Sequence, residues 1–244
     1  MLRSADKNAV KGSALFIILI AVALFAALGY AISQSGRSGS GSISRETVQI
    51  EAARIISYAG QIRQAVDRMR LVNGCSDTNI NFIGMPPLWS ANNPSSPADK
   101  SCHVFDAAGG GVPIIRFKTD SFTTPVSAGW TSYFSTFPLG YATFNSYNQL
   151  NGIGTTSGVD TSGVDLVFQI FPLSTDTCKE INRQLGLNGP SFAPTSATIY
   201  TVYNFTGVYS NGVTLSQYAP SVFGGCYYET SYAMNVYLLP LIER

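Results

Sequence analysis

The chain has 244 residues, enough for one good-sized domain, and its formal net charge is +1. Charged residues make up 12% of the sequence, against about 25% in a typical soluble domain. Because Lys and Arg are scattered rather than massed, the composition argues against a nucleic-acid partner.

The chain begins with a short polar leader, residues 1–12, that carries Arg3, Lys7 and Lys11 against one acidic residue. Residues 13–32 follow without any charge, and a helix of about 20 apolar residues can cross a bilayer. Positive charge beside such a span stays on the cytoplasmic side. We therefore expect a single-pass transmembrane helix, with the C-terminal residues outside the cytoplasm.

Three interpretations of this start remain open. It could be a secretory signal peptide, although the apolar run exceeds the usual length of about 7–15 residues. It could also be an uncleaved membrane anchor. The third interpretation is a leader that is cut on its cytoplasmic side, after Gly12.

The sequence KGSALFIILI, from Lys11 to Ile20, resembles the start of type IV pilins and type II secretion pseudopilins. In that family a prepilin peptidase cuts after the Gly, the new N-terminus is methylated, and the apolar helix enters the core of a filament. The resemblance covers roughly residues 11–72. It implies that Gly12 precedes the cut and that Ser13 is the first mature residue.

The resemblance also implies partners and a location. The filament core would run from Ala14 to Ile32, and the partners would be the membrane, other pilin-like subunits, the prepilin peptidase and an assembly platform with its ATPase. The protein would lie in the bacterial inner membrane, with its C-terminal domain in the periplasm or in an extracellular filament.

Two residues depart from the family pattern. Mature chains of the family usually begin with Phe or Met, whereas this one would begin with Ser13. They usually carry Glu at mature position five, where this chain has Ile17. That Glu is thought to pair with the N-terminus of a neighbouring subunit, so its replacement resembles the minor, tip-type subunits.

Residues 33–44 are a Gly/Ser linker. Gly is costly inside a helix, so Gly36, Gly39 and Gly41 should interrupt it. The linker would be either a hinge within a pilin-like helix or a spacer that holds a domain off a membrane. Ser44 can then cap an amphipathic helix over residues 45–72.

That helix carries an apolar stripe whose members are spaced alternately by four and three residues. The stripe contains Val48, Ala52, Ile55, Ala59, Ile62, Val66 and Met69. It could form a coiled coil with a partner helix. Small residues such as Ala52 and Ala59 favour the other possibility, that it lies across a β-domain and completes its core.

Residues 73–244 have the pattern of a β-rich, extracytoplasmic domain. The predicted strands are Val112–Asp120, Val164–Ile170 with one face buried, Thr198–Ser210, and a closing hairpin of Cys226–Glu229 and Tyr232–Leu239; a short helix is predicted over Cys178–Leu187. Residues 121–159 have no charge and many aromatic side chains, so they form either core strands or an interaction surface. The predicted fold class is α+β, with an N-terminal transmembrane helix and an amphipathic helix packed on a mainly antiparallel β-sheet domain.

Four cysteines, an even number, favour two disulfides in an oxidising compartment. Chain proximity pairs Cys75 with Cys102, which lies 27 residues further on, and leaves Cys178 for Cys226. Four cysteines allow three connectivities, and the sequence alone does not choose among them.

Catalytic and ligand-binding signals are weak. Cys102-His103 is adjacent in sequence, which does not make a catalytic dyad, and His103 is the only histidine. No metal set, phosphate loop or nucleophile motif is present. A calcium site at Asp160, Asp165 and Asp176 is conceivable, but their spacing matches no standard calcium loop and favours a solvated turn. We expect no enzyme activity and no cofactor or metal.

The expected function is that of a minor structural subunit of a type IV pilus or type II secretion pseudopilus. The alternative is a membrane-anchored extracytoplasmic binding or adhesion module that no prepilin peptidase processes.

Overall fold

The computed structural model describes most of the chain, in segments. These are residues 9–84, 92–123, 140, 142–150, 164–187, 195–197, 205–209, 213–215, 224–230 and 232–243. The chain divides into two compact units, Met1–Thr47 and Val48–Arg244.

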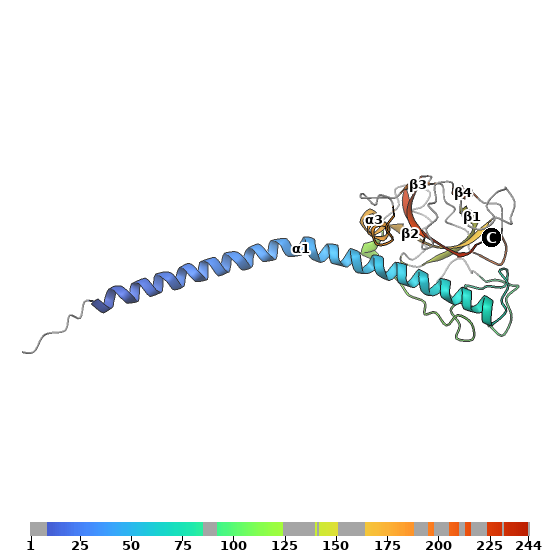
Figure 1. Cartoon of the computed structure of the whole chain (residues 1–244), viewed down its shortest axis with the longest axis horizontal. Coiled ribbons are helices and arrows are strands. Elements are labelled where there is room, and N and C mark those ends of the chain that lie inside the picture. Colours follow the sequence, from blue (N-terminus) through green and yellow to red (C-terminus); the bar gives the residue numbers. More distant parts are fainter. Residues whose placement is uncertain are drawn as a thin grey trace, which may run out of the picture. The chain divides into compact units, whose positions relative to one another are not determined.

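Helix α1 runs from Ala9 to Val72 and is the longest element, with 64 residues (Figure 1). The predicted interruption at residues 33–44 does not occur, because helical backbone continues through them. Each Gly costs about 1 kcal/mol relative to Ala. Extending an existing helix is nevertheless much easier than starting one, so the helical segments on either side favour a helical linker.

The structure corrects the predicted transmembrane helix over residues 13–32. Within the described part of the chain, no helix is both long and apolar enough to cross a membrane. The described side chains of this segment are those of residues 16–26, about half of the roughly 20 apolar residues that a bilayer crossing requires.

The second unit is built on a six-stranded sheet with the order β3-β5-β6-β2-β1-β4. Its strands are β1 (Thr143–Leu150), β2 (Asp165–Leu173), β3 (Thr195–Ala197), β4 (Val213–Leu215), β5 (Gly225–Glu229) and β6 (Met234–Ile242). The central strands β5, β6, β2 and β1 pair antiparallel, whereas the short strands β3 and β4 join the two edges in parallel. The α+β part of the predicted fold class therefore agrees with the structure, although the transmembrane helix does not.

Strands β2 and β6 form the centre of the sheet, and all of their residues are buried. The sequence predicted only one buried face for β2. Its second face is also covered, and even Asp165 and Gln169 are inaccessible to solvent. The closing hairpin is present, and β6 continues through Pro240 to Ile242 rather than ending at Leu239.

Helix α3, Thr175–Gln184, packs on β5 and β6. Its N-cap is Ser174, whose hydroxyl accepts the backbone N–H of Thr177 at 3.1 Å. This cap places the helix start three residues before the predicted one, because the hydroxyl satisfies an N–H that the first helical turn leaves unpaired.

The predicted strand Val112–Asp120 is wrong. The segment is irregular and ends in a short 3-10 helix, η1, at Thr119–Ser121. Its backbone groups bond to side chains of α1 instead of to a strand: the carbonyl of Pro113 accepts the Tyr58 hydroxyl at 3.1 Å, and the N–H of Lys118 donates to Glu51 at 2.8 Å. Of the predicted strand Thr198–Ser210, residues 205–209 are irregular and the others lie outside the described residues.

Candidate functional site

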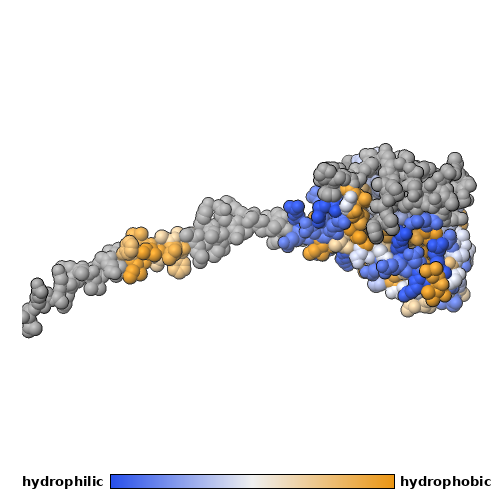
Figure 2. Space-filling model, in the orientation of Figure 1, coloured by the Kyte–Doolittle hydropathy of each residue, from blue (hydrophilic) through white to orange (hydrophobic). Residues whose placement is uncertain are grey.

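The first candidate site is the apolar segment of α1, residues 16–26, which all lie exposed (Figure 2). The exposed fraction ranges from 43% at Ile20 to 76% at Phe25 among its large side chains. No polar residue interrupts the sequence FIILIAVALFA. A helix that is apolar all round is stable only when other apolar surface covers it.

The predicted processing residues lie in the same unit. Gly12, Ser13, Ala14 and Ile32 all belong to α1, and the structure describes only their backbone. Ile17, at the position where the pilin family carries Glu, is 62% exposed. A solvent-facing isoleucine cannot replace the carboxylate in an ion pair, so α1 offers only apolar contact at this point.

The second candidate site is the docking face of α1, formed by the predicted stripe. Six of its seven residues are completely buried, and Val48 is half-buried: the six are Ala52, Ile55, Ala59, Ile62, Val66 and Met69. They join the hydrophobic core of the second unit, together with residues of β2 and β6. Figure 1 shows this part of α1 lying along the sheet.

Three further residues widen the docking face. Glu51, Tyr58 and Ala65 are buried and repeat every seven residues beside the stripe. The sequence contained this signal, because positions three residues before or after stripe members lie on the same side of a helix. The predicted stripe did not include Glu51 or Tyr58, which both carry polar groups.

Tyr58 joins α1 to the irregular segment and to the sheet. Its ring contacts Phe117 and Phe168 edge-on, with centroids 5.7 and 6.2 Å away. Such pairs contribute about 0.5–1.5 kcal/mol beyond the burial of their area. Burial raises the pKa of Tyr58 to about 12, and a backbone hydrogen bond with Ile115 opposes this rise in part.

Glu51 and Arg54 fix the same segment from the preceding turn of the helix. The carboxylate of Glu51 accepts the Lys118 N–H, while Arg54 lies 3.5 Å from that carboxylate. The Arg54 guanidinium stands over the ring of Phe117, 5.5 Å from its centroid. Buried carboxylates need such partners, because an isolated buried charge is very costly.

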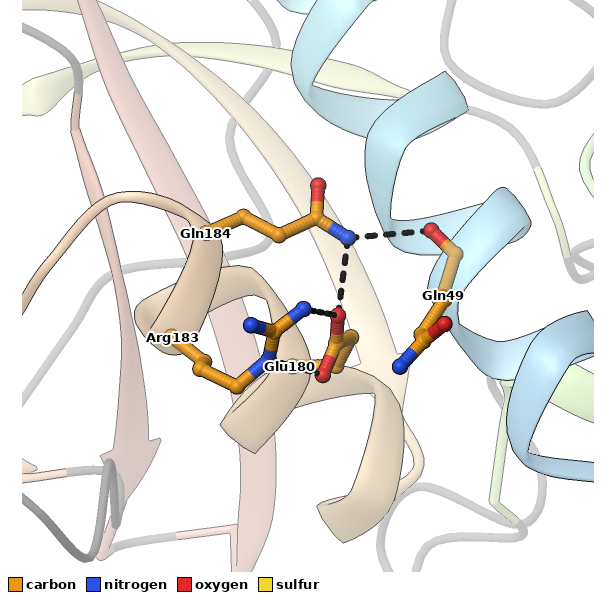
Figure 3. A network of polar contacts seen from close by, with 4 residues as sticks. All are labelled: Gln49, Glu180, Arg183 and Gln184. Carbon is orange, nitrogen blue, oxygen red and sulfur yellow. Dashed lines mark hydrogen bonds and ion pairs between the residues drawn. The ribbon is translucent and has the colours of Figure 1, made fainter.

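A polar network links helix α3 to α1 within the second unit (Figure 3). The side-chain amide of Gln184 donates to the backbone carbonyl of Gln49 at 3.0 Å and to the carboxylate of Glu180 at 2.9 Å. Arg183 binds the same carboxylate with two of its nitrogens. Glu180 therefore orients Gln184 toward the helix, and α1 is held from the α3 side as well as from the sheet.

Both predicted disulfides are confirmed. Cys75 bonds to Cys102 directly after α1 ends, and Cys178 of α3 bonds to Cys226 of β5. No cysteine of the described chain is free. Thiol catalysis at Cys102 is therefore not supported, since its sulfur is already bonded.

The glycine run 109–111 is a structural turn. All three of its N–H groups bond within the turn, to the carbonyls of His103 and Asp106. The carbonyls of Gly109 and Gly110 accept the guanidinium of Arg68, at 3.0 and 2.6 Å. A phosphate-binding loop requires free N–H groups, which this turn does not offer.

The calcium possibility receives no support. Asp165 is buried in β2, Asp176 is exposed in the first turn of α3, and Asp160 lies outside the described residues. Among the described residues, no group of three or more His, Cys, Asp or Glu side chains could hold a metal ion.

Of the uncharged segment 121–159, the structure describes residues 121–123, 140 and 142–150. Phe122 and Phe144 are buried, and Phe144 stacks on Phe82 with ring centroids 3.7 Å apart. These described aromatic residues belong to the core rather than to an exposed surface. Trp130, Tyr133, Phe134, Phe137, Tyr141 and Tyr147 are the other aromatic residues of the prediction, and their side chains lie outside the described set.

No protein-family model matches the chain, and comparisons with curated proteins and with solved structures also find no match. The resemblance to pilins and pseudopilins therefore rests on residues 11–72, and above all on Gly12 and the apolar sequence after it.

Proposed function

We propose that the chain is a minor structural subunit of a type IV pilus or type II secretion pseudopilus, and that it assembles through α1. The observation that carries the proposal is the exposure of residues 16–26 on every side of the helix. An apolar surface of this kind marks an interaction site. Neighbouring subunits with the same helix would supply matching apolar surface.

The gain from such packing is large. Fully burying one Leu, Ile or Phe side chain is worth about 1.5–3 kcal/mol, and residues 16–26 contain seven of them: Phe16, Ile17, Ile18, Leu19, Ile20, Leu24 and Phe25. One partner helix covers only part of the circumference. Several copies around each segment are needed, which favours a helical bundle at a filament axis over a simple dimer.

The second unit supports an extracytoplasmic location. Two disulfides persist in oxidising compartments and are rare in the cytoplasm. The docking face, already buried against the sheet, leaves the segment 16–26 as the surface for assembly. Ile17, in place of the family's Glu, favours a subunit present in few copies, because it cannot pair with the N-terminus of the next one.

The proposal is tested by the mass of the mature N-terminus, measured on protein from cells with and without a prepilin peptidase. We expect a methylated chain that begins at Ser13 when the peptidase is present, and an intact leader without it. Gly12→Val should block the cut, because the peptidase of the family that the leader resembles cuts after Gly. Gly39→Val, which makes the same change outside the leader, is the matched control and should be processed normally.

Two results would contradict the proposal. One is an intact leader in cells that contain the peptidase, which would favour an unprocessed extracytoplasmic binding module instead. The other is a chain that begins at Ser13 in both kinds of cell, since a different protease would then make the cut.

A further inference from the structure

A polar network lies beneath the loop that the Cys75–Cys102 disulfide closes. Asn81 and Asn93 are buried, with exposed fractions of 1% and 2%. Asn93 ties the loop together through its amide, which donates to the carbonyls of Thr78 and Ile80 at 2.6 and 2.8 Å. Asn81 lies beside it and contacts His103, the only histidine of the chain.

The side-chain amide of Asn81 can have only one orientation. Its Oδ1 accepts the backbone N–H of Ile83 at 3.0 Å, and its Nδ2 donates to the backbone carbonyl of Asn93 at 3.4 Å. A backbone N–H can only donate and a backbone carbonyl can only accept. Exchanging the oxygen and nitrogen of Asn81 would break both contacts, so the nitrogen faces His103.

This orientation dictates the state of the histidine ring. The Nδ2 of Asn81 lies 3.3 Å from the Nε2 of His103. Nδ2 carries two hydrogens and also faces the side-chain oxygen of Asn92, at 3.3 Å, and the carbonyl of Asn93. Because Nδ2 only donates, Nε2 can bond to it only as an acceptor, which requires a neutral ring whose proton is on Nδ1. A protonated ring would direct an N–H of Nε2 at an NH₂ group.

We propose that Asn81 and His103 form a pH-responsive clasp, closed when the ring is neutral and opened when acid protonates Nε2. The clasp joins two chain segments that also pair as a short bridge, in which the N–H groups of Asn81 and Val104 bond to the carbonyls of Cys102 and Asn81. Opening it removes one of the three contacts of the Asn81 side-chain nitrogen and leaves those to Asn92 and Asn93. Gly207 packs against the Asn93 amide, so the loosened region extends to residues 205–209.

Burial and the charges around His103 set the pH at which the clasp opens. Burial lowers the pKa of the ring; Asp106 and Asp99 oppose this effect, and Lys100 adds to it. The net result is a pKa below the ordinary value of 6.5, so the ring is neutral and the clasp is closed at pH 7. The clasp does not depend on the proposed function; it would act in any extracytoplasmic setting that acidifies.

Acidification should lower the stability of the folded chain. The unfolded chain binds a proton at His103 more readily than the folded chain does, so stability is present above pH 6.5 and falls as the pH drops toward the folded pKa. One proton changes the folding equilibrium constant by at most about tenfold per pH unit. Asp99 and Asp106 act in a separate window, since their pKa values lie below 3.8.

The experiment measures urea unfolding of the full chain, with disulfides intact, between pH 7.5 and 5. The wild-type folding constant should fall below pH 6.5. His103→Gln presents a side-chain oxygen to Asn81 and cannot titrate, so its constant should stay flat. Asn81→Asp places a carboxylate opposite the ring, so its constant should rise as the ring becomes charged, whatever its stability at pH 7.5.

A wild-type constant that stays level or rises on acidification would overturn the clasp, as would a fall of equal size in His103→Gln. Nitrogen chemical shifts of the single histidine give a second test that needs no variant. We expect an unprotonated Nε2 at pH 7.5, with faster exchange of the Ile83 amide once the ring titrates. A proton on Nε2 at pH 7.5 would exclude the mechanism.

Discussion

Residues 16–26 and 48–69 belong to one helix, yet their apolar side chains differ completely in exposure. Ile18 is 60% exposed, whereas Ile62 is completely buried. Residues 48–69 are apolar along one side and polar on the other, so a single sheet can cover their apolar side. Residues 16–26 are apolar on every side, which only several neighbours could cover. The pattern around the helix, rather than its hydrophobicity alone, separates a docking face from an assembly face.

One charge introduced into residues 16–26 and one into residues 48–69 should have the most different effects on stability. Ile62→Asp would bury a carboxylate without a partner and should lower the free energy of unfolding by more than about 4 kcal/mol. Ile18→Asp, the same substitution at an exposed position, should leave that free energy unchanged and reduce self-association instead. Urea unfolding measures the free energy of unfolding of both variants, and sedimentation measures their self-association.

Equal loss of stability in the two variants would contradict the division of α1 into docked and exposed parts. Ile18→Ala and Ile62→Ala separate the effect of charge from that of lost volume. Ile62→Ala should lower the free energy of unfolding by about 2–5 kcal/mol. Ile18→Ala should not change it measurably.

The two disulfides should also differ, though by less. In the chain-entropy account, closing loops with sequence separations of 27 and 48 residues stabilises by about 3.5 and 4 kcal/mol. Replacing both cysteines of a pair by Ser should therefore cost slightly more for Cys178–Cys226 than for Cys75–Cys102. Thermal unfolding of the two double variants measures the order. The reverse order would mean that the Cys75–Cys102 disulfide stabilises the fold by more than closing its loop.

The sequence predicted the docking stripe because its periodicity reflects local helix geometry. The helical spacing also places Glu51 beside the stripe, but the sequence does not show which group satisfies its carboxylate, since that N–H belongs to Lys118, 67 residues away. The same long-range bonds make residues 112–118 irregular, although their composition is typical of a strand. Chain proximity favoured the disulfide pairs that form, although it did not exclude the other two connectivities. The contact of Asn81 with His103 depends on backbone groups that only folding brings together.

Tyr58 gives the smallest expected effect at neutral pH and a larger one in alkali. Its pKa is raised to about 12 in the fold, and that of Tyr237 is raised as well because it is completely buried. Since the unfolded chain releases these protons from about pH 10, their contribution is complete below pH 10 and is lost as the pH rises. For Tyr58 alone, two pKa units correspond to about 2–3 kcal/mol by pH 12.

Tyr58→Phe measures how much of the stability lost above pH 10 comes from the Tyr58 hydroxyl. At pH 7 the variant should be about 1 kcal/mol less stable, because the carbonyl of Pro113 loses its donor. Between pH 10 and 12 its free energy of unfolding should decline less steeply than that of the wild type, with Tyr237 accounting for the remainder. Tyr228→Phe, at a side chain 37% exposed, is the matched control for losing a hydroxyl and should cost nothing at pH 7. If Tyr58→Phe and the wild type declined in parallel, the Tyr58 hydroxyl would have to be accessible to hydroxide in the folded chain, and α1 would not be closed against the segment that carries Pro113.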